Sequence, residues 1–315
     1  MIRLSIIIVN WNTEKILKKC LSLILKNIGD ISYEIIVVDN ASSDRSVVML
    51  EENFPDIKII RNRENTGFAR ANNAGIKEAK GDLLLLLNPD CFIEDGTLLE
   101  KWLEFMSSHT DTGISGCKLV FPDGRHQVGD AGYKPSFFAA LNYYLFLSKI
   151  FPFVFKGLFL NSERYARKIE VDWICGAACM VRKAILNKTG LLDEKIFMFS
   201  EDIEWGCRIK SFGFKVYYLP FLKIIHLQGS SVNMQDSNTQ FSTLWLRNLR
   251  NIYAFFNKHP LIFYDITAAA GFFIRFIIYY STSLFTGNKT KKNKAARMGK
   301  YLIFTLRNMG KPANM

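Results

Sequence analysis

The chain has 315 residues, of which 49% are hydrophobic and 22% charged, with only 20 glycines and 8 prolines. This composition excludes a disordered chain, a collagen-like fibre and a small disulfide-stabilised protein. At roughly 100–200 residues per domain, the length predicts one large domain or two smaller ones. The mean hydropathy of +0.06 is too low for a bundle made mostly of membrane spans.

The net charge of +12 is concentrated at the C-terminal end. Residues 1–240 contain 29 Lys and Arg against 28 Asp and Glu, whereas residues 241–315 contain 12 against one. A basic segment beside apolar, aromatic sequence is more typical of attraction to an anionic membrane surface than of nucleic-acid binding; a solvated surface helix is the alternative. We therefore expect an anionic membrane surface, and no nucleic acid, among the partners.

The first 120 residues alternate short apolar runs with amphipathic stretches. This pattern predicts strands that alternate with helices, one of which is opened by Ser and Asp caps. Such alternation favours an α/β fold with a mostly parallel sheet and helices on both faces. The expected strands are 4–9, 33–38, 57–60 and 82–87, and the expected helices are 14–26, 43–53 and 67–79.

The second half of the chain changes character. Residues 135–160 carry nine aromatic residues, two lysines and no acid, which is too aromatic for an ordinary exposed loop. Residues 171–183 and 197–220 return to α/β patterning. The six cysteines are scattered without metal-site spacing, and the first apolar run is too short for a signal peptide, so we expect reduced thiols and a cytoplasmic chain.

A helix is expected over residues 240–258, followed by an apolar segment, 261–285, that only Asp265 and Arg275 interrupt. Its longest uncharged stretch is 13 residues, 276–288, which is short of the ~20 that a transmembrane helix needs. A helix lying in the membrane interface therefore fits better. A tilted or hairpin insertion and a buried helix are the alternatives.

Polar side chains follow the predicted strands at the points where ligands bind in such sheets. Asn10 follows the first strand, Asp39 and Asn40 follow the second, and Asn88 and Asp90 follow strand 82–87. The glycine patterns of dinucleotide and P-loop phosphate sites are absent. We expect these side chains to converge at one edge of the sheet.

Three motifs could carry chemistry, and each has a structural alternative. Asp90, in Asn-Pro-Asp, suits a hard divalent cation together with a diphosphate, or the motif is merely a turn. Glu201 and Asp202 could supply a general base, or they could lie in a helix first turn that Ser200 caps. His226 could ligate a metal with a carboxylate, or it is a structural histidine.

A fourth motif lies at the start of the expected helix 67–79. Free N–H groups at that helix terminus, near Asn65 and Gly67, suit an anion, and Arg70 adds a full positive charge. A capped surface helix is the alternative.

Taken in this order, the segments resemble the family 2 glycosyltransferases with a GT-A fold, particularly the bacterial rhamnosyltransferase-like branch that builds surface polysaccharides. The resemblance implies a GT-A type mixed, mostly parallel sheet flanked by helices in a domain of residues 1–240, with an aromatic insertion at 135–160. A helical membrane-associating region, 241–315, follows. The matching segments are 5–12, 37–44, 65–68 with 72–73, 88–90, 176–178, and 200–202 with 226.

The resemblance also implies roles on the donor side. Asp39 matches the acidic residue that contacts the base or ribose of the nucleotide, and Asn10 lies in the loop that lines the same pocket. The expected nucleotide-sugar-binding set is Asn10, Asp39, Asn40, Asn65, Gly67, Arg70 and Asn88.

The remaining roles concern the metal and the base. Asn88-Pro89-Asp90 stands where the family carries Asp-x-Asp, so the resemblance assigns Mg²⁺ or Mn²⁺ to Asp90, with His226 completing the site. Asn88 replaces a carboxylate, which weakens the expected metal affinity. Asp202 matches the catalytic base, and Glu201 is its acidic neighbour.

The resemblance thus predicts an inverting transfer from a nucleoside-diphosphate sugar, dTDP-rhamnose or a UDP-hexose, to a lipid-linked glycan acceptor. The enzyme would be peripheral on the inner face of the cell membrane. Alternatives are a catalytically silent nucleotide-sugar-binding protein, a membrane scaffold, and a nucleotidyltransferase. The last would carry a Gly-rich basic loop after its first strand, where this chain has Asn10-Trp11-Asn12.

Overall fold

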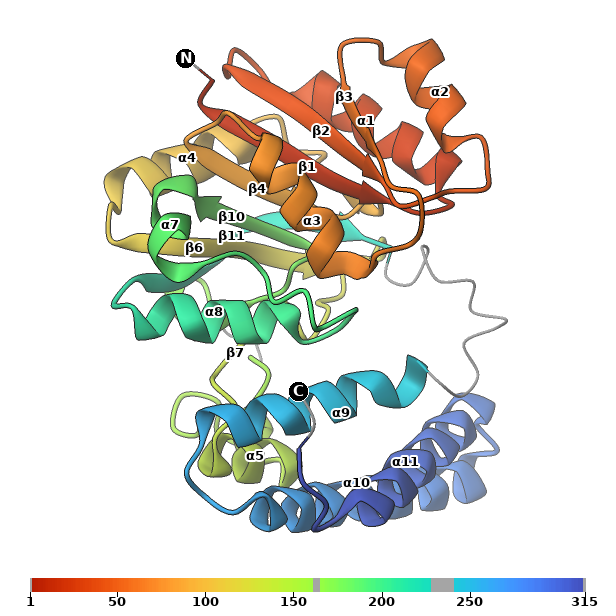
Figure 1. The fold of residues 1–315 in the computed structure, drawn as a ribbon. Helices are drawn as coiled ribbons and strands as arrows, with labels where there is room; N and C mark the ends of the chain where they lie inside the picture. Colours follow the sequence, from red (N-terminus) through yellow and green to blue (C-terminus); the bar gives the residue numbers. More distant parts are fainter. Residues whose placement is uncertain (1, 161–164, 228–240, 314–315) are drawn as a thin grey trace. The chain divides into compact units, whose positions relative to one another are not determined.

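The contacts within the chain separate it into two units, each built from two segments. Unit 1 comprises residues 1–132 and 162–237, and unit 2 comprises residues 133–161 and 238–315. The structure is a computed structural model that describes residues 2–160, 165–227 and 241–313 (Figure 1). The aromatic segment, which the sequence analysis placed as an insertion in the first domain, therefore groups with the C-terminal helices.

Unit 1 contains the sheet and the helices around it. Its strands are β1 (Leu4–Asn10), β2 (Tyr33–Asp39), β3 (Lys58–Arg61), β4 (Leu83–Leu87), β5 (Cys91–Phe92), β6 (Thr112–Val120), β7 (Ala131–Gly132), β8 (Ile169–Glu170), β9 (Trp173–Ile174), β10 (Ala178–Arg182) and β11 (Lys215–His226). Its helices are α1 (Glu14–Asn27), α2 (Ser46–Asn53), α3 (Gly67–Glu78), α4 (Leu98–Ser108), η2 (Lys183–Ile185), α7 (Leu186–Thr189) and α8 (Glu201–Ser211).

The main sheet has the strand order β3-β2-β1-β4-β10-β6-β11-β5, and β8 also pairs with β11. Strands β1 to β4, β6 and β11 run in one direction, whereas β5, β8 and β10 run in the opposite direction. A separate ladder joins β7 to β9. The predicted α/β architecture with a mixed, mostly parallel sheet is confirmed.

The elements expected in the first 90 residues are all present, with boundaries shifted by at most three residues. The largest shift is at α2, which begins at Ser46 rather than 43 because Asp44 Oδ1 accepts the Ser46 N–H (3.0 Å). All five residues of β4 are buried, as expected for a strand covered on both faces. Helices α1 and α4 cover one face, and α3 covers the other, with Gly75 against Ile7.

Unit 2 contains α5 (Phe137–Tyr144), α6 (Leu147–Ile150), α9 (Phe241–Phe256), α10 (Leu261–Thr286) and α11 (Lys289–Asn308). Helices α10 and α11 lie side by side (Figure 1), and the Phe272 and Tyr301 rings meet at 5.4 Å. The turn between them uses Gly287, whose φ of +63° favours glycine. Helix α9 matches the predicted 240–258 helix, of which residue 240 lies outside the described residues.

The two charges in the apolar segment are both held inside unit 2. Asp265 is fully buried and accepts two hydrogen bonds from Arg250, at 2.8 and 2.9 Å. Arg275 donates to the carbonyls of Tyr143 and Tyr144 on α5. The charges therefore do not interrupt the helix. Among the described residues α10 is the one helix that could cross a membrane by length and composition, with a mean hydropathy of 1.8 over its best window.

Gly206 on α8 lets this helix pack directly on the backbone of β9. A Cβ at Gly206 would lie 2.7 Å from Trp173 Cα and 2.8 Å from the Asp172 carbonyl oxygen, so the helix would have to move. We expect Gly206→Ala to lower the apparent free energy of unfolding by about 1–3 kcal/mol, because overpacking outweighs the gain in helix propensity. Urea denaturation measures the change.

Gly299→Ala is the matched control on α11, where a Cβ would meet Phe276 at an ordinary 3.6 Å. We expect this variant to be stabilised by a few tenths to about 1 kcal/mol through helix propensity alone. Equal stability of the two variants would contradict the proposed packing of α8 on β9.

Candidate active site

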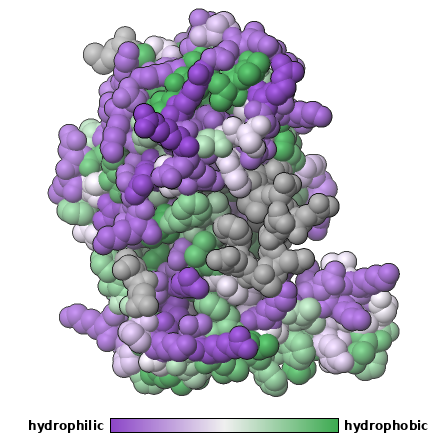
Figure 2. Space-filling view, turned by 45° about the vertical axis from the view of Figure 1, so that its right-hand side comes forward, coloured by the Kyte–Doolittle hydropathy of each residue, from purple (hydrophilic) through white to green (hydrophobic). Residues whose placement is uncertain are grey.

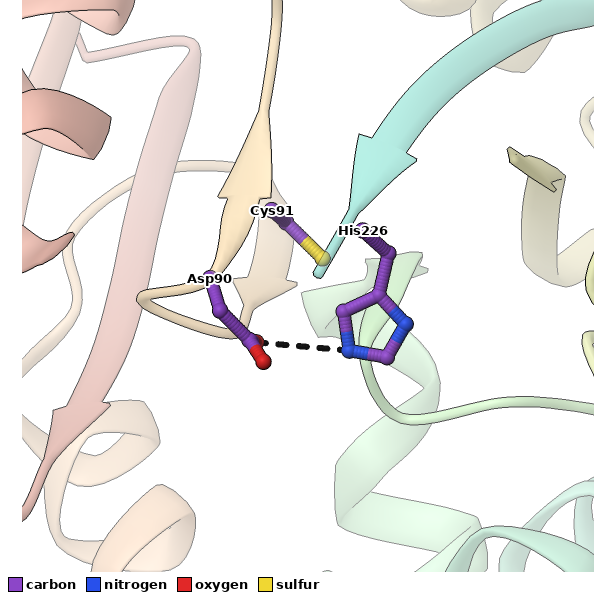
Figure 3. Close-up of side chains that lie close together, drawn as sticks. All are labelled: Asp90, Cys91 and His226. Atoms are coloured by element: carbon purple, nitrogen blue, oxygen red, sulfur yellow. Dashed lines mark ion pairs between the residues drawn. The ribbon is translucent and has the colours of Figure 1, made fainter. Parts of the chain in front are cut away.

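Asp90 and His226 face each other where β4 and β11 end. Strand β5 pairs antiparallel with β11, so that His226 lies opposite Cys91, and the Leu227 N–H donates to the Asp90 carbonyl (3.0 Å). His226 Nε2 lies 3.3 Å from Asp90 Oδ1 (Figure 3). The two residues are only 2% and 8% exposed. Residues 136 positions apart thus form one buried pair.

The pair fits a divalent cation. Asp90 Oδ1 is buried and accepts no hydrogen bond, which is unfavourable for a carboxylate unless a positive charge is near. Carboxylate oxygen and imidazole nitrogen are both metal ligands, and two protein ligands leave coordination positions for phosphate oxygens.

The Cys91 Sγ atom lies within 4.8 Å of the possible ligand atoms of Asp90 and His226, but Cys91 is poorly suited to bind a metal. Its thiol donates to the Ala177 carbonyl (3.2 Å). Burial raises the pKa of the Cys91 thiol well above its usual value, and the nearby Asp90 charge adds to the shift. Because the thiolate is the form that binds metals, Cys91 is better described as a packing residue.

A short turn at residues 176–177 connects the Asp90 loop to Asp202. The Ala177 carbonyl accepts the Asn88 N–H (2.8 Å), and the Gly176 N–H donates to Asp202 Oδ2 (3.0 Å). A Cβ at Gly176 would lie 2.9 Å from the Phe68 ring. The sequence analysis included this glycine in the resemblance without a role, and the structure shows that its backbone orients Asp202.

The start of α8 has unusual backbone geometry. Phe199 and Ser200 have φ angles of +68° and +73°, a left-handed conformation that is disfavoured for residues other than glycine. Such strain is often found at functional sites. Ser200 is the N-cap residue of α8, and Glu201 and Asp202 lie in the first turn, as the structural alternative expected, but the Ser200 side chain makes no cap hydrogen bond.

Glu201 and Asp202 are adjacent carboxylates with different surroundings. Burial raises the pKa of Glu201 well above its usual value, and the charge of Asp202 adds to the effect. Its Oε2 atom is buried without a hydrogen-bond partner. Burial also raises the pKa of Asp202, but N–H groups of Gly176 and Ile203 donate to its carboxylate and oppose the shift. Glu201 is therefore the carboxyl that stays protonated more readily.

Asn10 and Asp39 lie side by side at the ends of β1 and β2. Asn10 Nδ2 donates to Asp39 Oδ1 (2.9 Å) and to Ser42 Oγ (3.0 Å), and Asp39 Oδ2 accepts the Ser42 N–H (3.0 Å). Strand β4 is the other neighbour of β1, which brings Asn88 and Asp90 to the adjoining strand end. The predicted convergence at one edge of the sheet is confirmed for these four residues.

The residues expected at the start of α3 are largely engaged by the protein itself. Asn40 Oδ1 accepts the Thr66 N–H (3.0 Å), and Asn65 Oδ1 accepts the Gly67 N–H (3.0 Å). Arg70 Nε donates to Glu194 Oε2 (3.2 Å). This ion pair is separate from the pair of Asp90 and His226. Donor binding by Asn40, Asn65, Gly67 and Arg70 stays a prediction, and the observed hydrogen bonds of Asn40 and Asn65 order the loop between β3 and α3.

Gln127 is a site residue that sequence reasoning missed. Its Oε1 lies 2.8 Å from His226 Nδ1, and its Nε2 donates to the His226 carbonyl. The two residues are 99 positions apart, and nothing in the local sequence marks the glutamine.

The relatives of this chain include proteins named for the synthesis of cell-surface glycans. The chain is 25% identical over 201 residues to the O-antigen biosynthesis protein RfbC of Myxococcus xanthus, covering 63% of this chain and 15% of that protein. It is 24% identical over 219 residues to the N-acetylglucosaminyl-diphospho-decaprenol L-rhamnosyltransferase of Mycobacterium tuberculosis, covering 65% of this chain and 69% of that protein.

A solved structure supports the fold. The mannosyltransferase PcManGT of Pyrobaculum calidifontis, in complex with GDP-Man and Mn²⁺, superposes with a TM-score of 0.61 at 15% identity. The match covers 97% of this chain and 86% of that chain. At this identity the likeness shows the fold alone, which is the GT-A fold expected from the sequence.

The family follows from the sequence itself. The model described as Glycosyl transferase family 2 matches residues 5–188, which is more than half of the 315 residues. The matched region contains Asn10, Asp39, Asn88 and Asp90, the residues that converge at the sheet edge. The chain therefore belongs to glycosyl transferase family 2.

Proposed function

We propose that this protein is an inverting glycosyltransferase that moves a sugar from a nucleoside diphosphate to a lipid-linked glycan acceptor. The observation that carries the proposal is the buried pair of Asp90 and His226, which the 176–177 turn connects to Asp202. The names of the relatives support a role in cell-surface polysaccharide synthesis, with dTDP-rhamnose as the first donor to test and UDP-hexoses next.

Asp90 Oδ1 and His226 Nε2 are the atoms that would hold the cation. A bound divalent ion supplies positive charge that stabilises the negative charge on the leaving diphosphate. Imidazole nitrogen is a poorer ligand for Mg²⁺ than carboxylate or water, so the presence of His226 favours Mn²⁺ over Mg²⁺. Asp39 and Asn10, at the adjoining strand ends, hold the loop that would contact the nucleoside.

Asp202 is the proposed general base. It would accept the proton of the acceptor hydroxyl as that oxygen bonds to the anomeric carbon, while the bond to the diphosphate breaks and the electron pair leaves with the phosphate. One displacement inverts the configuration at the anomeric carbon. A carboxylate with a raised pKa is a stronger base than an ordinary aspartate.

Glu201 would keep the base singly charged. Two adjacent carboxylates, one buried and one half-buried, cannot both ionise easily, and Glu201 is the buried one, with an oxygen that lacks a partner. A neutral Glu201 therefore leaves the negative charge on Asp202, where the proton must be accepted.

The surface of unit 2 suits the proposed membrane contact. One face of α10 exposes apolar side chains at helical spacing, and Figure 2 shows hydrophobic side chains along the edge of this unit. The opposite face of α10 packs on α5 and α11, so the helix would lie in the lipid interface with only one face in lipid. The exposed apolar residues of α10 are Phe263, Ile266, Phe273, Ile274, Ile277, Ile278, Tyr280, Leu284 and Phe285.

Helix α11 supplies the charge complementarity. It carries Lys289, Lys291, Lys292, Lys294, Arg297, Lys300 and Arg307 without any acidic residue. Each basic side chain near an anionic bilayer contributes roughly 1 kcal/mol of attraction. We therefore propose that the enzyme is peripheral on the inner face of the cell membrane, where a lipid-linked acceptor is presented.

Asp202→Asn tests the base. We expect transfer to fall by ~10²–10⁴, because the amide cannot accept the proton, while donor binding persists. The assay measures nucleoside diphosphate release from dTDP-rhamnose and UDP-hexoses with a lipid-linked acceptor pool, with and without Mn²⁺. Asp30→Asn, an exposed substitution, is the control. A nearly fully active Asp202→Asn enzyme would overturn the assignment.

Glu201→Gln tests the buried carboxyl through pH. Because folding raises the pKa of Glu201, its contribution to stability is fully present below the unfolded pKa of about 4.3 and is lost as pH rises through the folded pKa. Glutamine cannot ionise, so the stability of the variant relative to wild type should increase as pH rises from 5 to 9. Urea unfolding across this range measures the difference, and a constant difference would contradict a neutral Glu201.

Ile277→Glu with Leu284→Glu tests the membrane surface in the full-length protein. Burying each side chain in lipid contributes about 1.5–3 kcal/mol, so binding to vesicles of phosphatidylglycerol and phosphatidylcholine should fall at least about tenfold. Vesicle sedimentation measures the bound fraction. Leu25→Glu with Val48→Glu, on exposed positions of unit 1, is the matched control. Equal sedimentation of the two double variants would show that α10 is not the contact.

A further inference from the structure

Gln127 contacts both the ring and the backbone of His226. The His226 carbonyl can only accept a hydrogen bond, so the Gln127 atom that faces it must be the Nε2 amide. The other end of the same amide is then Oε1, which also can only accept. Since Oε1 lies 2.8 Å from His226 Nδ1, Nδ1 must be the donor of that hydrogen bond.

The other ring nitrogen faces the proposed metal ligand. His226 Nε2 points towards Asp90 Oδ1 at 3.3 Å, and Nδ1 points away from it (Figure 3). In the neutral ring, hydrogen on Nδ1 leaves Nε2 with a lone pair. Two electron-rich atoms, Nε2 and Asp90 Oδ1, then face each other, and Oδ1 accepts no hydrogen bond. This arrangement repels itself until a cation lies between or beside the two atoms.

The loop that carries Gln127 is fixed by a second buried set of hydrogen bonds. Asp130 Oδ2 accepts from His126 Nε2 (2.8 Å) and from the Tyr218 hydroxyl (2.7 Å), and Asp130 is 1% exposed. The Gln127 N–H donates to the Leu119 carbonyl (2.9 Å). The amide of Gln127 is therefore anchored at its backbone and at both ends of its side chain, so it has no freedom to reverse.

We infer that Gln127 is a positioning residue that holds His226 in the Nδ1–H form and so keeps Nε2 available for a divalent cation beside Asp90. The inference deepens the proposed function and rests on its metal site. Partners of the second nitrogen commonly fix metal-binding histidines in this way, and their loss typically weakens metal affinity 10–100-fold. A neutral amide performs this role without adding charge to the site.

The first test needs no substitution. The protein labelled with ¹⁵N-histidine is observed by NMR without metal at pH 8.5, well above the ordinary histidine pKa of about 6.5. We expect hydrogen on Nδ1 of His226. Among the four histidines, His126 is the internal reference for hydrogen on Nε2, because its Nε2 donates to Asp130. Hydrogen on Nε2 of His226 would overturn the inference.

The second test compares Gln127→Met with Gln127→Glu. Methionine removes the acceptor, so we expect His226 to move its hydrogen to Nε2 and donate to Asp90, and Mn²⁺ affinity to fall about 10–100-fold. Glutamate retains an acceptor for His226 Nδ1. We therefore expect His226 to stay in the Nδ1–H form, and the Mn²⁺ affinity to be within about threefold of wild type or tighter. Mn²⁺ alone is titrated, and paramagnetic broadening of the His226 resonances reports its binding.

Asn27→Leu is the control for loss of an amide–carbonyl hydrogen bond. Asn27 is a half-buried residue of α1, a helix that carries no proposed ligand, and its Nδ2 donates to the Ile93 carbonyl. It should leave the His226 tautomer and Mn²⁺ broadening unchanged. Unchanged tautomer and affinity in Gln127→Met would overturn the inference. The His226 tautomer and the Mn²⁺ affinity are both measured without sugar transfer. A protein that is inactive with every donor would disprove the proposed function, whereas these two measurements would still decide the role of Gln127.

Discussion

The burial of Asp90 opposite His226 is the constraint around which the site is organised. A carboxylate that is 2% exposed and has one oxygen without a hydrogen bond is unfavourable unless positive charge is supplied. The fold creates this situation through one non-local pairing, in which the last residues of β11 lie between β6 on one side and β5 on the other. A register shift in the β6 pairing, between Leu219 and Lys223, precedes these residues. Strand pairing at the sheet edge thus sets the chemistry of the site.

Small residues allow the elements of the site to approach closely. A Cβ at Gly67 would lie 2.3 Å from the Phe197 carbonyl oxygen, and Gly176 and Gly206 have similarly close neighbours. These contacts connect the start of α3, the 176–177 turn and α8. Asp202 is therefore held by backbone contacts on several sides, and the strained Phe199 and Ser200 complete a rigid support for the proposed base.

The helices and strands of the first 90 residues and the carboxylates of the site could be predicted from the sequence. The residues that orient the site side chains through hydrogen bonds could not. β-Branched and leucine-rich runs identify β1, β2 and β4 because buried parallel strands require continuous apolar residues. Asp90 and Asp202 could be selected because charge at such positions is costly to bury. Gln127 could not be found, because its role depends on a hydrogen bond across 99 residues. The missing side-chain hydrogen bond at the Ser200 N-cap could not be foreseen, because capping statistics assume a backbone conformation that Ser200 does not adopt.

The discontinuous make-up of unit 2 has a consequence for protein synthesis. Its aromatic segment, 133–161, leaves the ribosome before the helices that cover it, because residues 162–237 are made in between. At ~5–20 residues per second, Tyr144 waits several seconds for Gly271 and Phe272 to be translated. During that interval unit 1 can complete its sheet, whereas the nascent aromatic segment has no α10 to pack against. The order of translation therefore separates the folding of the two units, because the sheet of unit 1 can form while the aromatic part of unit 2 still lacks its partner helices.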